Sequence, residues 1–307
     1  MKKNIDLSAN GKLLLAGEYL VLVGAKALAF PLRFGQSMHI EPAGHNQLHW
    51  VSNEQGMTWF SCDLDPTTLD IITASDHKVA LRLTDILLNA KKMNTEFLTG
   101  SIGLNIYVEA NYPLKWGLGS SSTLVALIAC WAEVDKYHLF RLTSLGSGYD
   151  IACTDRNSLL FYQRENGGIN VDDAHPGKAL LNNTCFAYLG KKQETAIELS
   201  AFLSGKNFTS FDIERISEIS LRICEADDPS NLCSLVDEHE GMLSRILKKE
   251  QIGNLFPGFP GSVKSLGAWG GDFAMFVSEM KNQDIKTWLT QTGYNDVFTF
   301  EELKVPV

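Results

Sequence analysis

The chain has 307 residues and a formal net charge of −9 at pH 7, with 45% hydrophobic and 21% charged residues. This length is enough for two packed domains, and the acidic balance argues against nucleic acid as the main partner, because binding its phosphates needs clustered lysines and arginines. The start of the chain is polar, and the apolar run LLLAGEYLVLV is interrupted by Glu18 and is too short to cross a membrane. The six cysteines form no C-x-x-C pair, so zinc is not indicated, and a reducing cytoplasm is the expected location.

Strand-like segments dominate the first half of the chain. Residues 12–22 are predicted to form a buried strand, a turn and a second strand. Apolar and polar residues then alternate, as they do in half-exposed antiparallel strands, over residues 37–42, 47–52, 57–62 and 102–110. Apolar residues at helical spacing predict a first helix over residues 78–92, and the apolar run that follows three serines predicts a second over about residues 120–137.

The second half of the chain is richer in helix. Helices are predicted at residues 211–224, 231–247 and 282–293, and a strand at residues 273–280. The least periodic region, residues 163–180, is the candidate domain boundary. It gives an N-terminal domain of residues 1–165 and a C-terminal domain of residues 166–307. Strands interleaved with helices predict an α+β protein.

The stretch PLKWGLGSSSTLVALIACWAE, residues 113–133, places two glycines and three serines directly before an apolar helix. Glycines let the backbone approach a ligand, and the first amides of a helix, with its dipole, make an anion site. Three hydroxyls are more than capping needs, so the pattern is typical of a phosphate cradle with one hydroxyl free for a magnesium ion. The alternative is a glycine turn with a serine cap. The stretch is neither a Walker loop nor a G-x-S-x-G elbow.

Two other stretches bear on this choice. GKLLLAGEYLVLVGAKALAFPL, residues 11–32, places Lys12 and Glu18 at the two ends of a strand–turn unit, and SLGSGYDIAC places Asp150 after a glycine-serine-glycine turn. By itself, a lysine near the N-terminus is usually solvated, and an aspartate after glycines usually forms a turn. In this order, and with the glycine–serine turn between them, these residues form a recognisable set.

The chain resembles the GHMP kinases, the superfamily of galactokinase, homoserine kinase, mevalonate kinase and phosphomevalonate kinase. Their first motif, P-G-K-[VIL]-x-L-x-G-E-[HY], is similar to NGKLLLAGEY, with Asn10 in place of the proline. Their second motif, P-x-x-x-G-L-G-S-S-[AS], is matched at every position by PLKWGLGSSS. Their third, a glycine-rich G-A-G-G-G-G, is similar to SLGAWGGDFAMFV, residues 265–277, where Trp269 and Asp272 replace small residues.

The resemblance runs from near residue 8 to at least residue 277. AGEY and GSGYD are most similar to the phosphomevalonate kinase branch, and GYDIA is a variant of the aspartate segment. The resemblance implies a two-domain α+β fold, with an N-terminal domain like ribosomal protein S5 domain 2, a C-terminal ferredoxin-like domain, and the active site between them. It also implies ATP and Mg²⁺ as cofactors. The ATP-binding residues would be Gly117, Leu118, Gly119, Ser120, Ser121, Ser122, Gly267, Gly270 and Gly271.

The resemblance also assigns chemical roles. Asp150 would accept the proton of the substrate hydroxyl or orient it, and Lys12 would stabilise the negative charge that develops during transfer. Ser121 matches the serine that binds magnesium in relatives. Glu18 would support this catalytic group, or it would be a buried structural partner of Lys12.

One departure concerns the metal. Relatives have two helices between the serine turn and the aspartate, and the second helix bears a magnesium-binding glutamate. Here 28 residues separate Ser121 from Asp150, and the predicted helix nearly fills them, so this glutamate is not expected. Glu133 and Asp135 are the nearest acidic residues, but position 133 lies about 18 Å from the helix start. Both are expected to be solvated at the helix end.

The leading interpretation is a cytoplasmic kinase that transfers phosphate from ATP to mevalonate or phosphomevalonate, acidic substrates of isoprenoid biosynthesis. The alternatives are an ATP-dependent decarboxylase of the same fold, or a nucleotide-binding protein that has lost catalysis, against which the presence of both Lys12 and Asp150 weighs. Neither nucleic acid nor a membrane is an expected partner, and the oligomeric state stays open. A phosphate acceptor would need more cations near the cleft, and the candidates are Arg33, Lys115, Lys191, Lys192 and Lys264.

Overall fold

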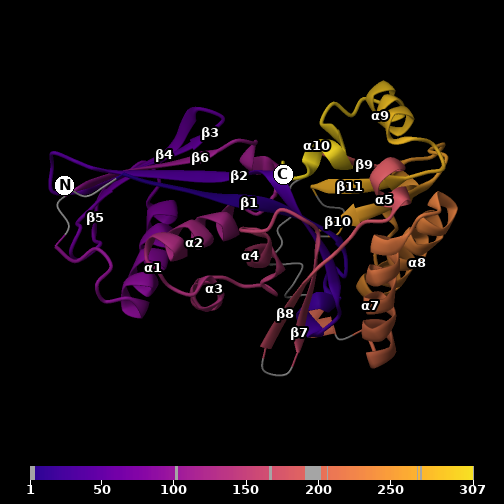
Figure 1. Ribbon diagram of the computed structural model, residues 1–307, viewed down its shortest axis with the longest axis horizontal. Coiled ribbons are helices and arrows are strands. Elements are labelled where there is room, and N and C mark those ends of the chain that lie inside the picture. Colours follow the sequence, from indigo (N-terminus) through magenta and orange to yellow (C-terminus); the bar gives the residue numbers. More distant parts are fainter. Residues whose placement is uncertain are drawn as a thin grey trace. The chain divides into compact units, whose positions relative to one another are not determined.

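The computed structural model describes residues 4–100, 103–165, 168–190, 202–205, 207–267, 269 and 272–306. The chain divides into two compact units, and Figure 1 labels their helices and strands. Unit 1 contains residues 1–11, 34–114 and 118–155, and unit 2 contains residues 12–33, 115–117 and 156–307.

This division differs from the expected boundary between residues 165 and 166. The chain passes from one unit to the other within two long strands, β1 (Ile5–Ala16) and β2 (Ala27–Pro42), and leaves unit 1 for the last time after Asp155. Residues 12–33 therefore belong to the same unit as the C-terminal half. A loss of periodicity in the sequence cannot reveal such a boundary, because an uninterrupted strand carries the chain across it.

Unit 1 contains a mixed sheet. Its strands follow the order β5 (Ile71–Ala74), β4 (Met57–Leu64), β3 (Leu48–Glu54), β6 (Leu104–Ala110) and the second part of β2, which also pairs with β1. Strands β3 and β6 run parallel, whereas the pairs β5–β4, β4–β3 and β6–β2 are antiparallel. The predicted alternating segments correspond to parts of β2, β3, β4 and β6, in which buried and exposed residues alternate, although Met57, Trp59 and Tyr107 are exposed.

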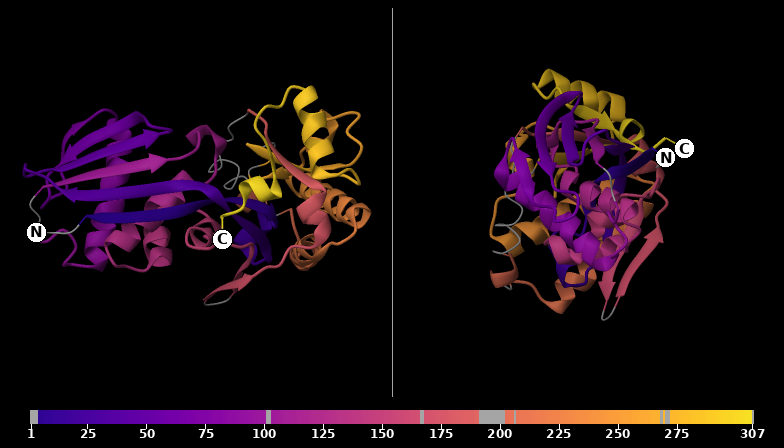
Figure 2. Two further views of the ribbon diagram at one scale, coloured as in Figure 1. Left: turned by 45° about the horizontal axis from the view of Figure 1, so that its top comes forward. Right: turned by 90° about the vertical axis from the view of Figure 1, so that its left-hand side faces the viewer.

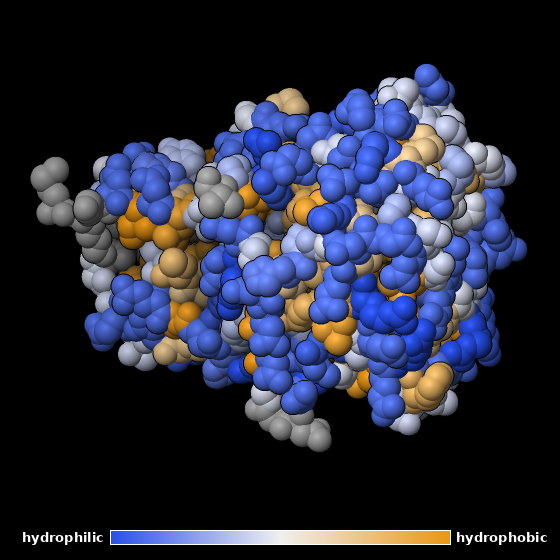
Figure 3. All heavy atoms as spheres, turned by 45° about the vertical axis from the view of Figure 1, so that its right-hand side comes forward, coloured by the Kyte–Doolittle hydropathy of each residue, from blue (hydrophilic) through white to orange (hydrophobic). Residues whose placement is uncertain are grey.

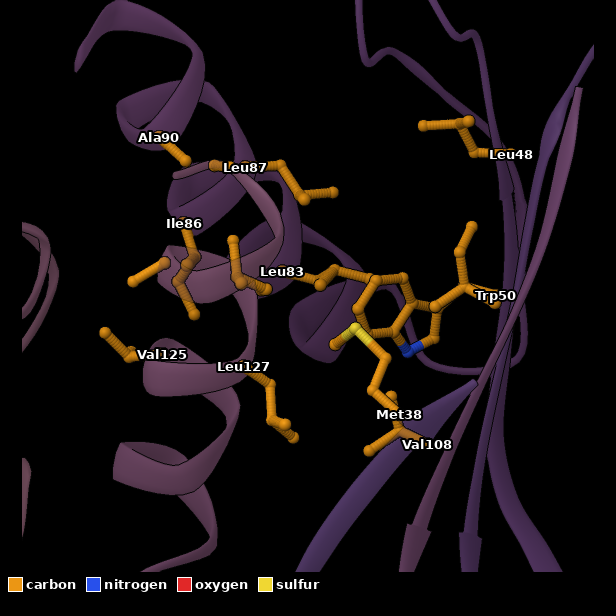
Figure 4. Packing of buried hydrophobic residues seen from close by; sticks show 14 of the residues in the cluster. Met38, Leu48, Trp50, Leu83, Ile86, Leu87, Ala90, Val108, Val125 and Leu127 are labelled. Carbon is orange, nitrogen blue, oxygen red and sulfur yellow. The ribbon is translucent and has the colours of Figure 1, made fainter. Parts of the chain in front are cut away.

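The helices of unit 1 cover the apolar face of this sheet. Their bounds are α1 (His77–Met93), α2 (Ser120–Trp131), α3 (Lys136–Thr143) and α4 (Tyr149–Cys153). Helix α1 begins where the Asp76 carboxylate accepts the backbone N–H groups of Lys78 and Val79, at 2.9 and 3.1 Å. Figure 4 shows Leu83 and Leu87 of α1 directed toward Trp50 on the sheet.

The predicted single helix over residues 120–137 is two helices. Helix α2 ends at Trp131, Glu133 adopts a left-handed backbone conformation with φ 54°, and α3 begins after Asp135. The Asp135 carboxylate caps α3 by accepting the N–H of His138 at 2.6 Å. The apolar run hid this break, because the residues on both sides of it pack in the same core.

Unit 2 contains an antiparallel sheet with the order β10 (Ser262–Leu266), β11 (Phe273–Val277), β9 (Thr184–Tyr188) and β12 (Val297–Thr299). Helices α7 (Ser210–Glu225) and α8 (Pro229–Leu247) follow β9, and α9 (Asn282–Gln291) joins β11 to β12. This succession is the β-α-β-β-α-β arrangement of ferredoxin-like domains, so the expected fold of the C-terminal part and the α+β class are confirmed.

The helices of unit 2 follow the predicted apolar faces. Helix α7 starts with a capping box in which Thr209 and Asp212 each accept the other's backbone N–H. Helix α8 packs against β10 and β11, and α9 packs against β9 and β12. Two short helices of this unit are α5 (Lys178–Asn182) and α10 (Phe300–Leu303). Strands β7 (Leu160–Glu165) and β8 (Gly168–Asp173) form a hairpin, visible in Figure 2, and β7 also pairs with the first part of β2.

The segment after β1 differs from its prediction. A second strand was expected within residues 12–22, but Leu20–Val23 forms a turn of 3-10 helix. Two further 3-10 turns lie at Leu114–Trp116 and Ile252–Leu255. In the turn at Leu20–Val23, Leu20 and Val21 are buried. The apolar pattern therefore predicted the burial of this segment correctly but its strand conformation wrongly.

No helix in the described part of the chain is both long and apolar enough to cross a membrane. On the face drawn in Figure 3, hydrophilic residues cover most of the surface, with smaller hydrophobic areas between them.

Candidate active site

The glycine–serine turn lies directly before α2, as the sequence predicts. Gly119 is the N-cap of this helix, and its φ of 94° is a left-handed conformation that favours glycine. Within the described residues no side chain caps the helix; the N–H groups of Ser122 and Thr123 both donate to the Gly119 carbonyl, each at 3.0 Å. The amides of Ser120 and Ser121 at the helix start are therefore oriented toward whatever occupies the turn.

The three serines have different surroundings. Ser121 is exposed, Ser120 is half-buried, and Ser122 is 4% exposed. The hydroxyl of Ser122 donates a hydrogen bond to Oδ2 of Asp150, whereas Ser120 is hydrogen-bonded to Tyr112, whose pKa is raised by burial. Of the three serines, Ser121 is the most exposed, and its role as the metal-binding serine stays a prediction.

Asp150 lies in the first turn of α4, after Gly148, which has a φ of 94°. Its side chain is half-buried. Oδ1 accepts the N–H of Ile151 at 3.1 Å, and Oδ2 accepts the Ser122 hydroxyl. The fold of unit 1 thus brings the predicted catalytic aspartate to the predicted phosphate-binding turn.

The first motif also meets this turn in unit 1. A Cβ placed on Gly11 would lie 2.6 Å from the Phe34 carbonyl oxygen and 2.7 Å from the Leu118 carbonyl oxygen. Only glycine allows so close an approach of the two backbones. Leu118 is itself 1% exposed, so its role is packing, and only its backbone is available to a phosphate.

Lys12 is the next residue and begins the part of β1 that belongs to unit 2. Its side chain is half-buried, and Nζ donates a hydrogen bond to the Gly117 carbonyl at 3.1 Å. Lys12 and Asp150 therefore contact opposite ends of one continuous turn, residues 117–122. They belong to different units, and their convergence on one substrate stays a prediction.

Glu18 pairs with Lys264 rather than with Lys12. Both side chains are buried, and Lys264 Nζ donates to Glu18 Oε1. The expectation of a buried structural role is met, but with a partner 246 positions along the chain. Burial raises the pKa of Glu18, and the Lys264 charge opposes this change. Lys264, considered above as a cation for a phosphate acceptor, is committed to this pair.

Two residues of α8 complete the buried cluster around Glu18 and Lys264. His239 Nε2 accepts the Gly17 N–H at 3.0 Å and lies 3.4 Å from Glu18 Oε2. Burial and the Lys264 charge hold the pKa of His239 well below its usual range, so the imidazole is neutral. Glu240 accepts the N–H groups of Ile252 and Ser265, and burial raises its pKa to about 7.

Replacing Lys264 by methionine is expected to destabilise the protein by roughly 3–5 kcal/mol, because Glu18 would be left buried without a countercharge. The measurement is the free energy of unfolding in urea. The double variant Glu18→Gln/Lys264→Met removes both charges and is expected to recover most of this loss. A double variant no more stable than Lys264→Met would show that the lost charge pair is not the cause.

The third motif is tied to the first by Trp269. Its backbone N–H donates to the Tyr19 hydroxyl at 2.7 Å, and its indole Nε1–H donates to the Glu250 carbonyl at 3.0 Å. The ring is buried with Tyr19, Leu20 and residues of α7 and α8. Gly267 has the left-handed φ of 78°, whereas Gly270 and Gly271, two of the expected ATP-binding residues, lie outside the described residues.

The structure does not place the other candidate cations in a buried site. Arg33 and Lys115 are both exposed, and Lys191 and Lys192 lie outside the described residues. Glu133 and Asp135 belong to the link between α2 and α3 described above. Helix α3, with the sequence KYHLFRLT, carries no acidic residue.

Sequence reasoning missed Trp116, which precedes Gly117. The Trp116 ring is 7% exposed and packs in unit 2 against three aromatic rings, with centroids 5.3 to 6.2 Å away: Tyr188, Phe273 and Phe298. The Tyr188 hydroxyl also donates to the Lys115 carbonyl at 3.3 Å. These contacts determine where the turn begins. The available signal was a large aromatic residue directly before a glycine in the motif.

Solved structures share this fold over nearly the whole chain. Phosphomevalonate kinase of Streptococcus pneumoniae, in complex with phosphomevalonate and AMPPNP, has a TM-score of 0.73 at 16% identity and covers 96% of this chain and 99% of its own. Methanococcus jannaschii mevalonate kinase has a TM-score of 0.70 at 14% identity, covering 99% of each chain. Lactococcus lactis galactokinase complexed with galactose has a TM-score of 0.65 at 10% identity, covering 99% of this chain and 94% of its own.

The chain therefore has the two-domain fold of the GHMP kinases, as its motifs predict. No protein-family model and no curated protein matches the sequence. The structures that share the fold act on acceptors as different as phosphomevalonate and galactose, so the fold by itself does not select a substrate.

Proposed function

We propose that this protein is an ATP-dependent kinase that transfers the γ-phosphoryl group to a hydroxyl or phosphate of a small acidic acceptor. One observation carries the proposal. The Ser122–Asp150 hydrogen bond places a carboxylate beside a glycine–serine turn at an uncapped helix start. A phosphate-binding turn next to a proton acceptor is the combination that phosphoryl transfer to a hydroxyl requires.

The residues of the turn fit a nucleotide. Its glycines let the backbone approach phosphate oxygens, and the amides of Ser120 and Ser121 would donate to them. Mg²⁺, bound by the exposed Ser121 hydroxyl and the phosphates, would neutralise charge on the transferring group. A metal held largely by phosphates agrees with the described residues, among which no three histidines, cysteines or carboxylates form a cluster that could bind one.

Two side chains would carry out proton acceptance and charge stabilisation. Asp150 would accept the proton of the acceptor hydroxyl, and its hydrogen bonds to Ser122 and the Ile151 amide fix the orientation of the carboxylate. Lys12, whose ammonium contacts the Gly117 carbonyl, would stabilise the negative charge that develops on the phosphoryl oxygens. The reaction would take place in the cytoplasm; the six cysteines, all within the described residues, are free thiols.

For the acceptor we propose mevalonate or its 5-phosphate. AGEY and GSGYD are most similar to the phosphomevalonate kinase branch, and the phosphomevalonate complex from S. pneumoniae shares the fold. An acidic acceptor needs local cations, because the chain carries a net charge of −9. With Lys264 paired to Glu18, Lys12 is the first candidate for that role.

The test is ATP turnover with mevalonate, phosphomevalonate, galactose and homoserine at equal concentrations. The expected result is activity with one of the two mevalonate acids. A preference for galactose or homoserine would refute the proposed acceptor, but the proposal that the protein is a kinase would stand. Decarboxylation of diphosphomevalonate would select the decarboxylase of the same fold. ATP binding without turnover of any of these compounds would leave the acceptor open and would favour a protein that has lost catalysis.

A further inference from the structure

Asp272 brings a carboxylate into contact with the start of the glycine–serine turn. A Cβ placed on Gly117 would lie 2.0 Å from Asp272 Oδ2, so this oxygen touches the Gly117 backbone. The position is firmly held: the Asp272 carbonyl accepts the Leu189 N–H at 2.8 Å, and the next residue, Phe273, begins β11 and is 1% exposed. Both residues belong to unit 2, so the contact does not depend on how the units are placed.

The surroundings of this carboxylate are partly buried. Oδ1 of Asp272 is shielded from solvent. The neighbouring Tyr188 has a raised pKa, first because of burial and then because of the negative charges of Asp272 and Asp296. A charge that acts on Tyr188 also acts on anything bound at the turn, because Tyr188 donates to Lys115 and packs on Trp116, the two residues before Gly117.

A negative charge at this place conflicts with a bare triphosphate. Two like charges about 7 Å apart repel by roughly 2 kcal/mol at an effective dielectric constant of about 20. This corresponds to about a thirtyfold loss in affinity for each interacting charge. A divalent cation bound to the phosphates removes the conflict and adds an attraction to the carboxylate.

We propose that Asp272 makes nucleotide binding at the turn selective for the metal complex. The inference rests on the proposed function, since it takes the turn to be the phosphate site. The carboxylate repels the metal-free triphosphate and favours the same nucleotide carrying Mg²⁺. This role also compensates for α3, which has no acidic residue to favour the metal.

The experiment measures ATP affinity by calorimetry, once with excess EDTA and once with excess Mg²⁺. For the unaltered protein, the magnesium complex is expected to bind at least about 30-fold more tightly than metal-free ATP. In Asp272→Asn this ratio is expected to fall about tenfold or more, chiefly because metal-free ATP binds more tightly. Asp272→Gly, which introduces the residue of the glycine-rich motif, provides a second variant if the amide disturbs folding.

Asp296→Asn is the matched control. Asp296 also acts on Tyr188 but has no contact with Gly117 among those the structure gives, so its removal is expected to leave the ratio unchanged. An unchanged ratio in both Asp272 variants, or an unaltered protein that binds metal-free ATP as tightly as the magnesium complex, would overturn the inference while the turn remains a nucleotide site. Failure of the unaltered protein to bind either form would overturn the proposed function and the inference with it.

Discussion

Replacing Asp150 by asparagine is expected to lower the turnover number by about 10²–10⁴-fold while ATP affinity changes little. Asparagine keeps the size of the side chain and can still accept the Ser122 hydroxyl, but it cannot take up the acceptor's proton. The measurement combines steady-state turnover with calorimetric ATP affinity, because the two quantities separate loss of chemistry from loss of binding.

A nearby aspartate provides the control. Asp155 is exposed and pairs with Lys136 at 2.7 Å in unit 1, so Asp155→Asn is expected to keep full turnover. Ser122→Ala is expected to give a smaller loss than Asp150→Asn, since it only frees the orientation of the carboxylate. If Asp150→Asn retained turnover within about threefold of the unaltered protein, proton acceptance by Asp150 would be excluded.

Gly119→Val is expected to weaken ATP binding by at least about a hundredfold. Gly119 has a φ of 94°, a conformation that a β-branched residue rarely adopts. In the proposed site its backbone lies where the first amides of α2 would meet a phosphate, and a side chain there would block the approach. ATP affinity measured by calorimetry, with the unfolding midpoint recorded in parallel, checks this prediction.

Gly56→Val is the control for this prediction. It places valine at another glycine with a left-handed backbone conformation, away from the glycine–serine turn. Gly56 lies in the turn between β3 and β4, has a φ of 78°, and a Cβ there meets nothing within 4 Å. Its loss of stability is expected to match that of Gly119→Val, with ATP affinity unchanged. Should Gly119→Val bind ATP normally, the phosphate would have to bind elsewhere and the role of the turn would be wrong.

Local patterns in the sequence predicted most elements of the fold. The helices at α1, α7, α8 and α9 were predicted within two residues at each end, because each has an apolar face of several turns that packs into the core of its unit. The glycine–serine turn was placed correctly before α2 for a similar reason: a left-handed glycine and the residues of a helix start are neighbours in the chain.

The contacts that could not be predicted from the sequence join residues that are far apart along the chain. Nothing near Glu18 indicates Lys264 as its partner, and a lysine in the strand-like run SVKSL gives no sign of being fully buried. The break between α2 and α3 was missed because apolar residues on both sides of it pack in the same core, so the helical pattern continues past the capping residue Asp135. The contact of Asp272 with Gly117 depends on the tertiary fold, although the departure of Asp272 from a small residue was visible.

The pairing of Glu18 with Lys264 has a consequence for how the chain folds as it is made. The partners are 246 positions apart, and at bacterial or eukaryotic elongation rates the ribosome needs on the order of 10–50 s to add that many residues. For much of this time the apolar segment 12–33 is already synthesised, whereas residues 156–307, which form most of unit 2, are still incomplete. The nascent chain must therefore keep its first strands from aggregating until translation is almost finished, because β10 and then β11 and β12, the last strands of unit 2, are made at the end of the chain.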